Sequence, residues 1–313
     1  MDLKYLTKEG SWEKNPPDLQ AEVLQGKRGR LLVTIYRAGG AGLHPTVLLS
    51  HGFPGIEKNF DLAQALRRIG FHVVLYHYSG SWGSDGAYAY AHNLEDADTL
   101  LEFIETNTTY GFDKERLFVA GHSVGGFVTA QLLAAHPELK AAVLLAPCDL
   151  GGVMGFADDT EPKRLLMDIF EGGPIWLNGT SPAALYEEVF ANQASYRIGA
   201  LLKRFGKRPV YCLGAVRDEC CPPAAHCLPW VEELKKMGGN VVYEALDTDH
   251  SFSDTRLQMI EKTAKFLAEQ VQSICFVVLL IEFLLFAERK KLDWNNCFMI
   301  SGAVFLSFGA AFV

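Results

Sequence analysis

The sequence predicts an α/β fold built on a mostly parallel, doubly wound sheet. Short apolar runs alternate with helical patterns along most of the chain, which is the order expected when helices cover both faces of such a sheet. Of the 313 residues, 49% are hydrophobic and 21% are charged, a composition that folds. The formal net charge of −8 argues against a general nucleic-acid binder, which needs a basic face to displace the counterions of phosphate.

Seven segments have the composition of strands. Residues 31–36 are rich in β-branched and other strand-forming residues and should form an early antiparallel strand. Further strands, beginning with a continuous apolar run typical of buried parallel strands, are expected at 46–50, 71–76, 117–120, 141–145, 209–213 and 241–246. Helices are expected at 61–69, at 93–107 with Asn93 as its cap, from the turn at 121–126 to about 135, at 225–237, and from about 253.

Two stretches interrupt the alternation. Residues 150–206 contain several short helical patterns and are too long for a plain connection, and residues 271–313 are far more apolar than the rest. We therefore expect an N-terminal extension at 1–27, a core in two parts at 28–149 and 207–270, a helical insertion at 150–206, and an apolar tail at 271–313.

The strongest local signal is the G-x-S-x-G motif at residues 121–125. A predicted strand precedes it and a predicted helix follows, which is the context of a nucleophile elbow. Only small neighbours fit a tight, strained turn, and such a turn presents the hydroxyl of Ser123 at the carboxyl edge of the sheet. The alternative is a serine in an ordinary Gly-rich turn.

A serine hydroxyl becomes a good nucleophile only when a base takes its proton and a third group orients that base. Asp218 and His250 each follow a later predicted strand, so their loops should open on the same sheet edge as Ser123. These residues are the expected acid and base. The alternatives are Glu219, Asp247 and Asp249 for the acid, and His122, His136 and His226 for the base.

Acyl transfer also needs hydrogen-bond donors for the developing oxyanion. The loop His51-Gly-Phe-Pro-Gly55 follows the first predicted parallel strand and supplies the backbone N–H of Phe53. The second expected donor is the N–H of Val124, directly after the nucleophile. Pro54 has no N–H and is excluded. A simple strand-to-helix turn is the alternative interpretation of this loop.

With these motifs in order, the sequence resembles the α/β-hydrolase superfamily. HGFPG, GHSVGG, RDECCPP and DHSF match its oxyanion loop, nucleophile elbow, acid loop and histidine loop, and YHYSGSWGSDG resembles the dienelactone hydrolase and prolyl-oligopeptidase-like branch. The resemblance covers about residues 28–270. It implies a Ser123–Asp218–His250 triad, oxyanion donors at Phe53 and Val124, a lid at 150–206, and neither metal nor organic cofactor. Dienelactone hydrolases proper use a cysteine where this chain has Ser123.

The expected function is therefore a serine hydrolase that cleaves small-molecule carboxylic esters through an acyl-enzyme. One alternative is a hydrolase of small peptides with the same triad. Another is a non-catalytic, membrane-tethered binding module. Met154, Phe156, Leu165, Leu166, Met167, Ile169 and Phe170 are candidates to line an apolar substrate pocket, although such residues more often pack a lid onto the body.

The cysteines and the chain ends give weaker indications. Seven cysteines without regular spacing predict neither a disulfide framework nor a structural zinc site, with redox sensitivity of Cys220 and Cys221 as a minor alternative. The N-terminus lacks an apolar signal segment, so we expect a cytoplasmic body. For residues 271–313 we expect a membrane anchor, with a helix packed on the body or a non-native extension as alternatives.

Overall fold

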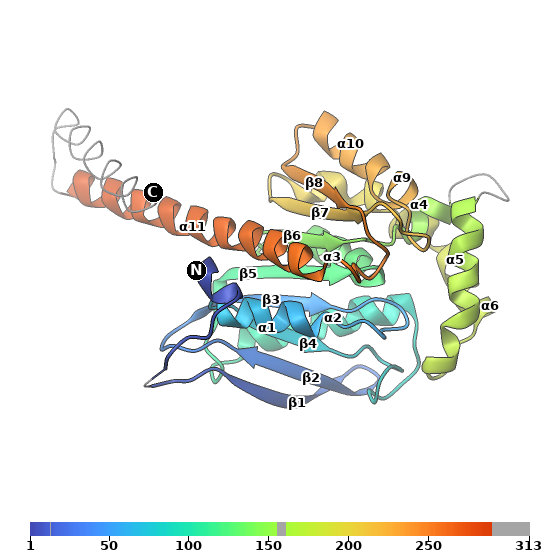
Figure 1. Ribbon diagram of the computed structural model, residues 1–313, viewed down its shortest axis with the longest axis horizontal. Helices are drawn as coiled ribbons and strands as arrows, with labels where there is room; N and C mark the ends of the chain where they lie inside the picture. The colour runs from blue at the N-terminus through green and yellow to red at the C-terminus, as the bar shows by residue number, and fades with distance from the viewer. Residues whose placement is uncertain (13, 155–160, 290–313) are drawn as a thin grey trace. The chain divides into compact units, whose positions relative to one another are not determined.

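The computed structural model describes residues 1–12, 14–154 and 161–289. Within them, eight strands form one sheet in the order β1-β2-β4-β3-β5-β6-β7-β8 (Figure 1). β2 pairs antiparallel with both β1 and β4, and all other neighbours are parallel. The strands are β1 Asp18–Gly26, β2 Gly29–Arg37, β3 His44–Ser50, β4 His72–Tyr76, β5 Phe112–His122, β6 Ala142–Leu145, β7 Val210–Ala215 and β8 Val241–Leu246.

This sheet confirms the predicted fold class. All seven predicted strands are present, and β4 and β6 are buried along their whole length, as their apolar runs require. β1 was not expected, and it lies in the segment interpreted as an N-terminal extension. It is an edge strand, and every second residue, Leu19 and Val23 among them, is exposed, so it lacks the continuous apolar run that marks a buried strand.

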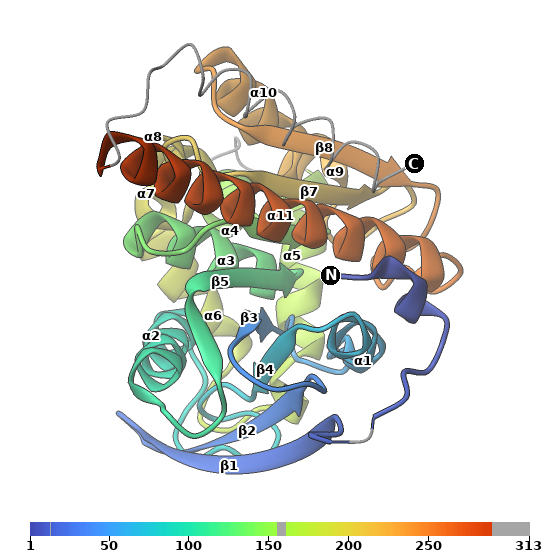
Figure 2. The ribbon, with the colours of Figure 1, turned by 90° about the vertical axis from the view of Figure 1, so that its left-hand side faces the viewer.

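Helices cover both faces of the sheet (Figures 1 and 2). One face carries α1 and the first part of α11, which are joined by hydrogen bonds from Arg256 to Asp61 and Asn59. α2 and α3 lie on the other face. The helices are α1 Phe60–Arg68, α2 Tyr90–Thr106, α3 Val124–Ala135, α4 Leu150–Met154, α5 Glu161–Gly172, α6 Pro182–Ala191, α7 Gln193–Tyr196, α8 Leu202–Phe205, α9 Pro223–His226, α10 Leu228–Lys236 and α11 Arg256–Arg289, with 3-10 turns η1 Leu3–Leu6, η2 Pro174–Trp176 and η3 Ile198–Leu201.

α2 begins three residues earlier than predicted. Asn93 is buried inside the helix, where its side-chain amide donates to the Tyr88 hydroxyl at 2.9 Å, so the prediction of Asn93 as the cap was wrong. The carboxylate of Glu188 instead accepts the free N–H groups of Tyr90 and Ala91, at 3.0 and 2.6 Å. A residue of α6 therefore supplies the cap that the local sequence lacks.

The insertion at 150–206 connects β6 to β7 through α4–α8. It is fastened to the loop after β4 by two backbone hydrogen bonds, from Asn178 to Gly80 at 2.7 Å and from Tyr88 to Asn178 at 2.9 Å. The indole rings of Trp82 and Trp176 stack beside them with centroids 5.9 Å apart. These backbone hydrogen bonds fix the position of the insertion against the loop between β4 and α2.

The chain divides into two compact units between Gln270 and Val271, and the structure describes the second unit only as far as residue 289. No helix in the described ranges has both the length and the apolarity needed to cross a membrane. The predicted anchor at 271–313 gains no support from these helices, and its residues 290–313 lie outside the described part of the chain.

Candidate active site

Ser123 occupies the sharp turn between β5 and α3. Its backbone has φ 58° and ψ −122°, in the positive-φ region that side chains other than glycine rarely adopt. A Cβ at Gly121 would lie 2.0 Å from the carbonyl oxygen of Gly125, and a Cβ at Gly125 would lie 2.1 Å from that of Ser50. Both positions therefore require glycine, which is the steric reason for the G-x-S-x-G spacing.

The loop after β3 lies directly against Ser123. A Cβ at Gly52 would stand 2.9 Å from the Ser123 Cβ and 3.4 Å from its Oγ. The structure thus brings the expected oxyanion loop to the expected nucleophile. The Ser123 hydroxyl makes no hydrogen bond to any residue in the described ranges, so the predicted contact with His250 is not closed in this conformation.

Asp218 and His250 meet across the carboxyl ends of β7 and β8. His250 Nδ1 lies 2.6 Å from Asp218 Oδ2. A carboxylate only accepts hydrogen bonds, so Nδ1 carries the hydrogen and Nε2 keeps a lone pair when the ring is neutral. The other oxygen, Oδ1, accepts the N–H groups of Cys220 and Cys221 at 2.8 and 2.7 Å.

These contacts control the charge of Asp218. Burial alone raises the pKa of this carboxyl, but the hydrogen bond and charge of His250 and the amides of Cys221 and Cys220 outweigh it, so the pKa lies below its ordinary value. Asp218 therefore remains a carboxylate at neutral pH. Of the alternatives, Asp247 pairs with Arg217, and Asp249 accepts from Ser253.

The alternative histidines have other surroundings. His122 is buried, and burial first of all lowers its pKa to about 3, so its ring stays neutral. Its Nε2 donates to the backbone carbonyl of His250 at 2.8 Å, a contact that sequence reasoning missed. His136 pairs with Asp98 and Glu138.

Two backbone N–H groups remain open beside Ser123. Val124 is the first residue of α3, and neither its N–H nor that of Phe53 donates to a residue in the described part of the chain. The loop that carries Phe53 is held by two hydrogen bonds, from the Tyr78 hydroxyl to the His51 carbonyl at 3.0 Å and from Trp82 Nε1 to the Pro54 carbonyl at 2.7 Å. Such fixed, unsatisfied donors are what an oxyanion needs.

The side chain of Phe53 packs into an aromatic cluster. Its ring centroid lies 5.6 Å from that of Tyr88, 6.1 Å from that of Tyr90 and 6.1 Å from that of Phe170 in the insertion. Phe170 is fully buried, so it packs the insertion onto the body. Met167 and Ile169 are partly buried, while Phe156 and the side chains of Met154, Leu165 and Leu166 lie outside the described part of the structure.

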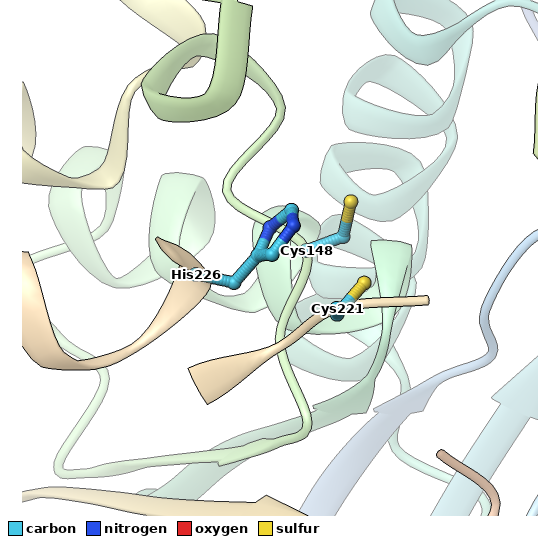
Figure 3. A group of neighbouring side chains, drawn as sticks. All are labelled: Cys148, Cys221 and His226. Carbon is cyan, nitrogen blue, oxygen red and sulfur yellow. The ribbon is translucent and has the colours of Figure 1, made fainter. Parts of the chain in front are cut away.

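One cluster of metal-ligand type occurs among the described residues. Cys148, Cys221 and His226 are buried, and one ligand atom from each lies within 4.8 Å of the others (Figure 3). The prediction of no structural zinc site rested on the absence of C-x-x-C pairs, and that criterion does not detect a cluster of this kind. Cys221 and His226 lie in one segment after β7, and Cys148 follows β6, so the pairing of β6 with β7 in the folded sheet brings the cluster together.

Two known proteins or families with similar sequences are named for hydrolases. The family model of serine aminopeptidase S33 matches residues 43–157, which include Ser123 but neither Asp218 nor His250. Cutinase est1 of Thermobifida alba is 27% identical over 134 residues. That match covers 42% of this chain and 44% of the cutinase, so the chain matches less than half of this curated relative's length.

Solved structures show the same fold. The acylaminoacyl peptidase of Pyrococcus horikoshii superimposes with a TM-score of 0.60 at 16% identity, over 82% of this chain and 42% of the peptidase. Est1E of Butyrivibrio proteoclasticus, solved with ferulic acid bound, gives a TM-score of 0.61 at 17% identity, over 80% of this chain and all (100%) of Est1E. The sheet order, the turn at Ser123 and these likenesses show that the chain has the α/β-hydrolase fold. The family model and the curated relative that it matches are both named for hydrolases.

Proposed function

We propose that the protein is a serine hydrolase that cleaves carboxylic esters of small molecules through an acyl-enzyme. The observation that carries the proposal is the 2.6 Å hydrogen bond between Asp218 and His250. It leaves His250 Nε2 as an acceptor at the sheet edge where Ser123 occupies its strained turn. The fully bonded carboxylate of Asp218 holds the ring in that tautomer.

In the proposed reaction, His250 Nε2 takes the proton of Ser123 as Oγ attacks the acyl carbon. The N–H groups of Phe53 and Val124 stabilise the negative oxygen of the tetrahedral intermediate. His250 then protonates the leaving alcohol, and the same base activates the water that releases the acid. The described structure has no hydrogen bond between the Ser123 hydroxyl and His250. This is compatible with the proposed role, because catalytic hydrogen bonds are often long before substrate binds.

A small-peptide hydrolase with the same triad is the second candidate, favoured by the family match and by the acylaminoacyl peptidase fold. A peptidase that reads a free amino terminus needs an unpaired carboxylate near the site. Glu219, directly after Asp218, is an exposed carboxylate at this site, so the substrate test below decides between the ester and the peptide.

The test compares an activated p-nitrophenyl ester with an aminoacyl p-nitroanilide. We expect turnover of the ester, labelling by a fluorophosphonate probe, and loss of both in Ser123→Ala, with kcat/KM falling by about 10³-fold or more. Ser195→Ala, a substitution at an exposed serine of α7, is the matched control. Undiminished hydrolysis by Ser123→Ala would reject the mechanism, and preference for the anilide would select the peptidase.

A further inference from the structure

The cluster of Cys148, Cys221 and His226 (Figure 3) takes no part in the proposed reaction, yet backbone hydrogen bonds join it to the residues that do. Cys148 follows β6, and its N–H donates to the carbonyl of Ser123 at 2.9 Å. Cys221 lies in the loop after β7, and its N–H donates to Asp218 at 2.7 Å. His226 ends α9. The backbone N–H groups of the two cysteines therefore help to hold Ser123 and Asp218 in place.

The protonation of His226 decides what this cluster can bind. The N–H of Asp149 donates to His226 Nδ1 at 3.0 Å, so Nδ1 holds a lone pair and the hydrogen of the neutral ring lies on Nε2. This Nε2 is buried, with no hydrogen-bond partner in the described structure. A nitrogen that carries a hydrogen cannot ligate a metal ion, but it is a ready donor to a thiolate.

We propose that Cys148 and Cys221 are a redox-active thiol pair that peroxide closes to a disulfide, with the Nε2–H of His226 stabilising the Cys148 thiolate. The thiolate attacks one oxygen of hydrogen peroxide, and hydroxide leaves and takes up a proton to become water. Cys148 is then a sulfenic acid. The sulfur of Cys221 attacks the sulfenic sulfur, its thiol proton leaves with the hydroxyl as a second water, and the S–S bond forms. The two sulfurs together lose the two electrons that reduce the peroxide.

The two thiols have the unequal acidity that this sequence of steps requires. The neighbouring Cys221 thiol, together with His226, lowers the pKa of Cys148 below the ordinary value of a thiol in spite of its burial. Burial and the neighbouring Cys148 sulfur raise the pKa of Cys221 well above its ordinary value. One partner is thus the thiolate that attacks peroxide, and the other remains the protonated resolving thiol.

The protein contains its own matched control. Cys212 and Cys227 are a second buried pair of neighbouring thiols. Burial and the contact with Cys227 raise the pKa of Cys212 well above its ordinary value, so Cys212 stays a protonated thiol. Under the same peroxide dose we expect the first pair to close while Cys212 and Cys227 stay reduced.

The experiment treats the full-length protein with hydrogen peroxide and maps its disulfides by non-reducing peptide mass spectrometry. We expect a Cys148–Cys221 link that dithiothreitol reverses. Cys148→Ser should abolish it and leave Cys221 as a free thiol. His226→Phe should slow closure at pH 6 about tenfold, since an ordinary thiol is almost fully protonated there, and His226→Gln, which keeps a donor, should restore part of the rate. Melting temperatures verify that each variant is folded.

Three results would overturn the proposal. In the first, both thiols remain free after peroxide treatment. In the second, the only peroxide product is on Cys220. In the third, the purified protein binds about one zinc ion per chain and Cys148→Ser does not. The last result would make the cluster a metal site. Thiol mapping needs no turnover, so it stands apart from the proposed function. We further expect closure to lower ester hydrolysis and dithiothreitol to restore it, because both cysteines adjoin Ser123 and Asp218. This effect alone rests on the proposed function.

Discussion

His122 donates its Nε2 hydrogen to the backbone carbonyl of His250 at 2.8 Å, and the two imidazole rings lie 4.7 Å apart. His122 directly precedes Ser123, so a single hydrogen bond joins the nucleophile turn to the loop of the proposed base. The low pKa of His122, about 3 and caused mainly by burial, keeps this ring uncharged beside the imidazole of the proposed base. The residue is thus suited to position His250 without opposing its protonation.

Replacing His122 by Phe should lower kcat for ester hydrolysis by about tenfold with little change in KM, because the ring volume remains but the donor to His250 is lost. His122→Gln, which keeps an N–H donor, should recover part of kcat. Steady-state kinetics of both variants provide the measurement. His136→Phe, at a partly buried site whose ring pairs with Asp98 and Glu138, serves as the control. Equal kcat in His122→Phe and wild type would show that the contact is only structural.

Asp218→Asn should lower kcat by about 10³ to 10⁴-fold while the protein stays folded. In the wild type, Oδ1 accepts two backbone N–H groups. In the variant, the amide oxygen should take the position of Oδ1 and accept the same two groups, so that the NH₂ group faces His250. His250 Nδ1 must then accept, the hydrogen moves to Nε2, and Nε2 no longer takes the proton of Ser123. Asp247→Asn and Asp249→Asn should remain within about threefold of wild type. A larger loss in either would assign the acid differently.

Glu188→Ala should destabilise the fold by about 0.5–2 kcal/mol, because the N–H groups of Tyr90 and Ala91 at the start of α2 lose their acceptor. Thermal or urea denaturation measures this loss. Glu187→Ala, at the exposed neighbouring position, should have almost no effect. If both variants melt alike, the cap contributes nothing to stability.

Asp149→Asn should raise the melting temperature at pH 8 and have little effect at pH 4. Burial raises the pKa of Asp149 to about 6, against the hydrogen bonds from Ile198 and Gly152. A carboxyl whose pKa is higher in the folded state is most favourable below the unfolded value of 3.8, and its contribution is lost as the pH rises through 6. The cost at pH 8 is up to about 3 kcal/mol.

Asparagine keeps the two hydrogen bonds, because both N–H groups donate to the same oxygen, Oδ1 of Asp149. Melting curves of the wild type and of Asp149→Asn between pH 4 and pH 8 measure the difference. Asp168→Asn, an exposed substitution in α5, is the control. A gain in melting temperature that is the same at every pH would contradict the linkage.

The sequence alone determined the alternation of strands and helices, and with it the fold class. Continuous apolar runs report burial on both faces of a strand, and this is a local property. The G-x-S-x-G turn is equally local, since the close approach of Gly125 to Ser50 tolerates no Cβ. The edge strand β1 was not predicted because its exposed face breaks the apolar run.

Only the tertiary structure decided which side chains meet. Four acidic residues were open as partners of His250, and the geometry of the loops after β7 and β8 selected Asp218. Glu188 reaches the start of α2 across 98 residues of sequence, and Cys148 meets Cys221 through the adjacency of β6 and β7. Such contacts depend on the order of strands in the sheet. That order follows from the packing of the whole chain, and no local pattern of residues encodes it.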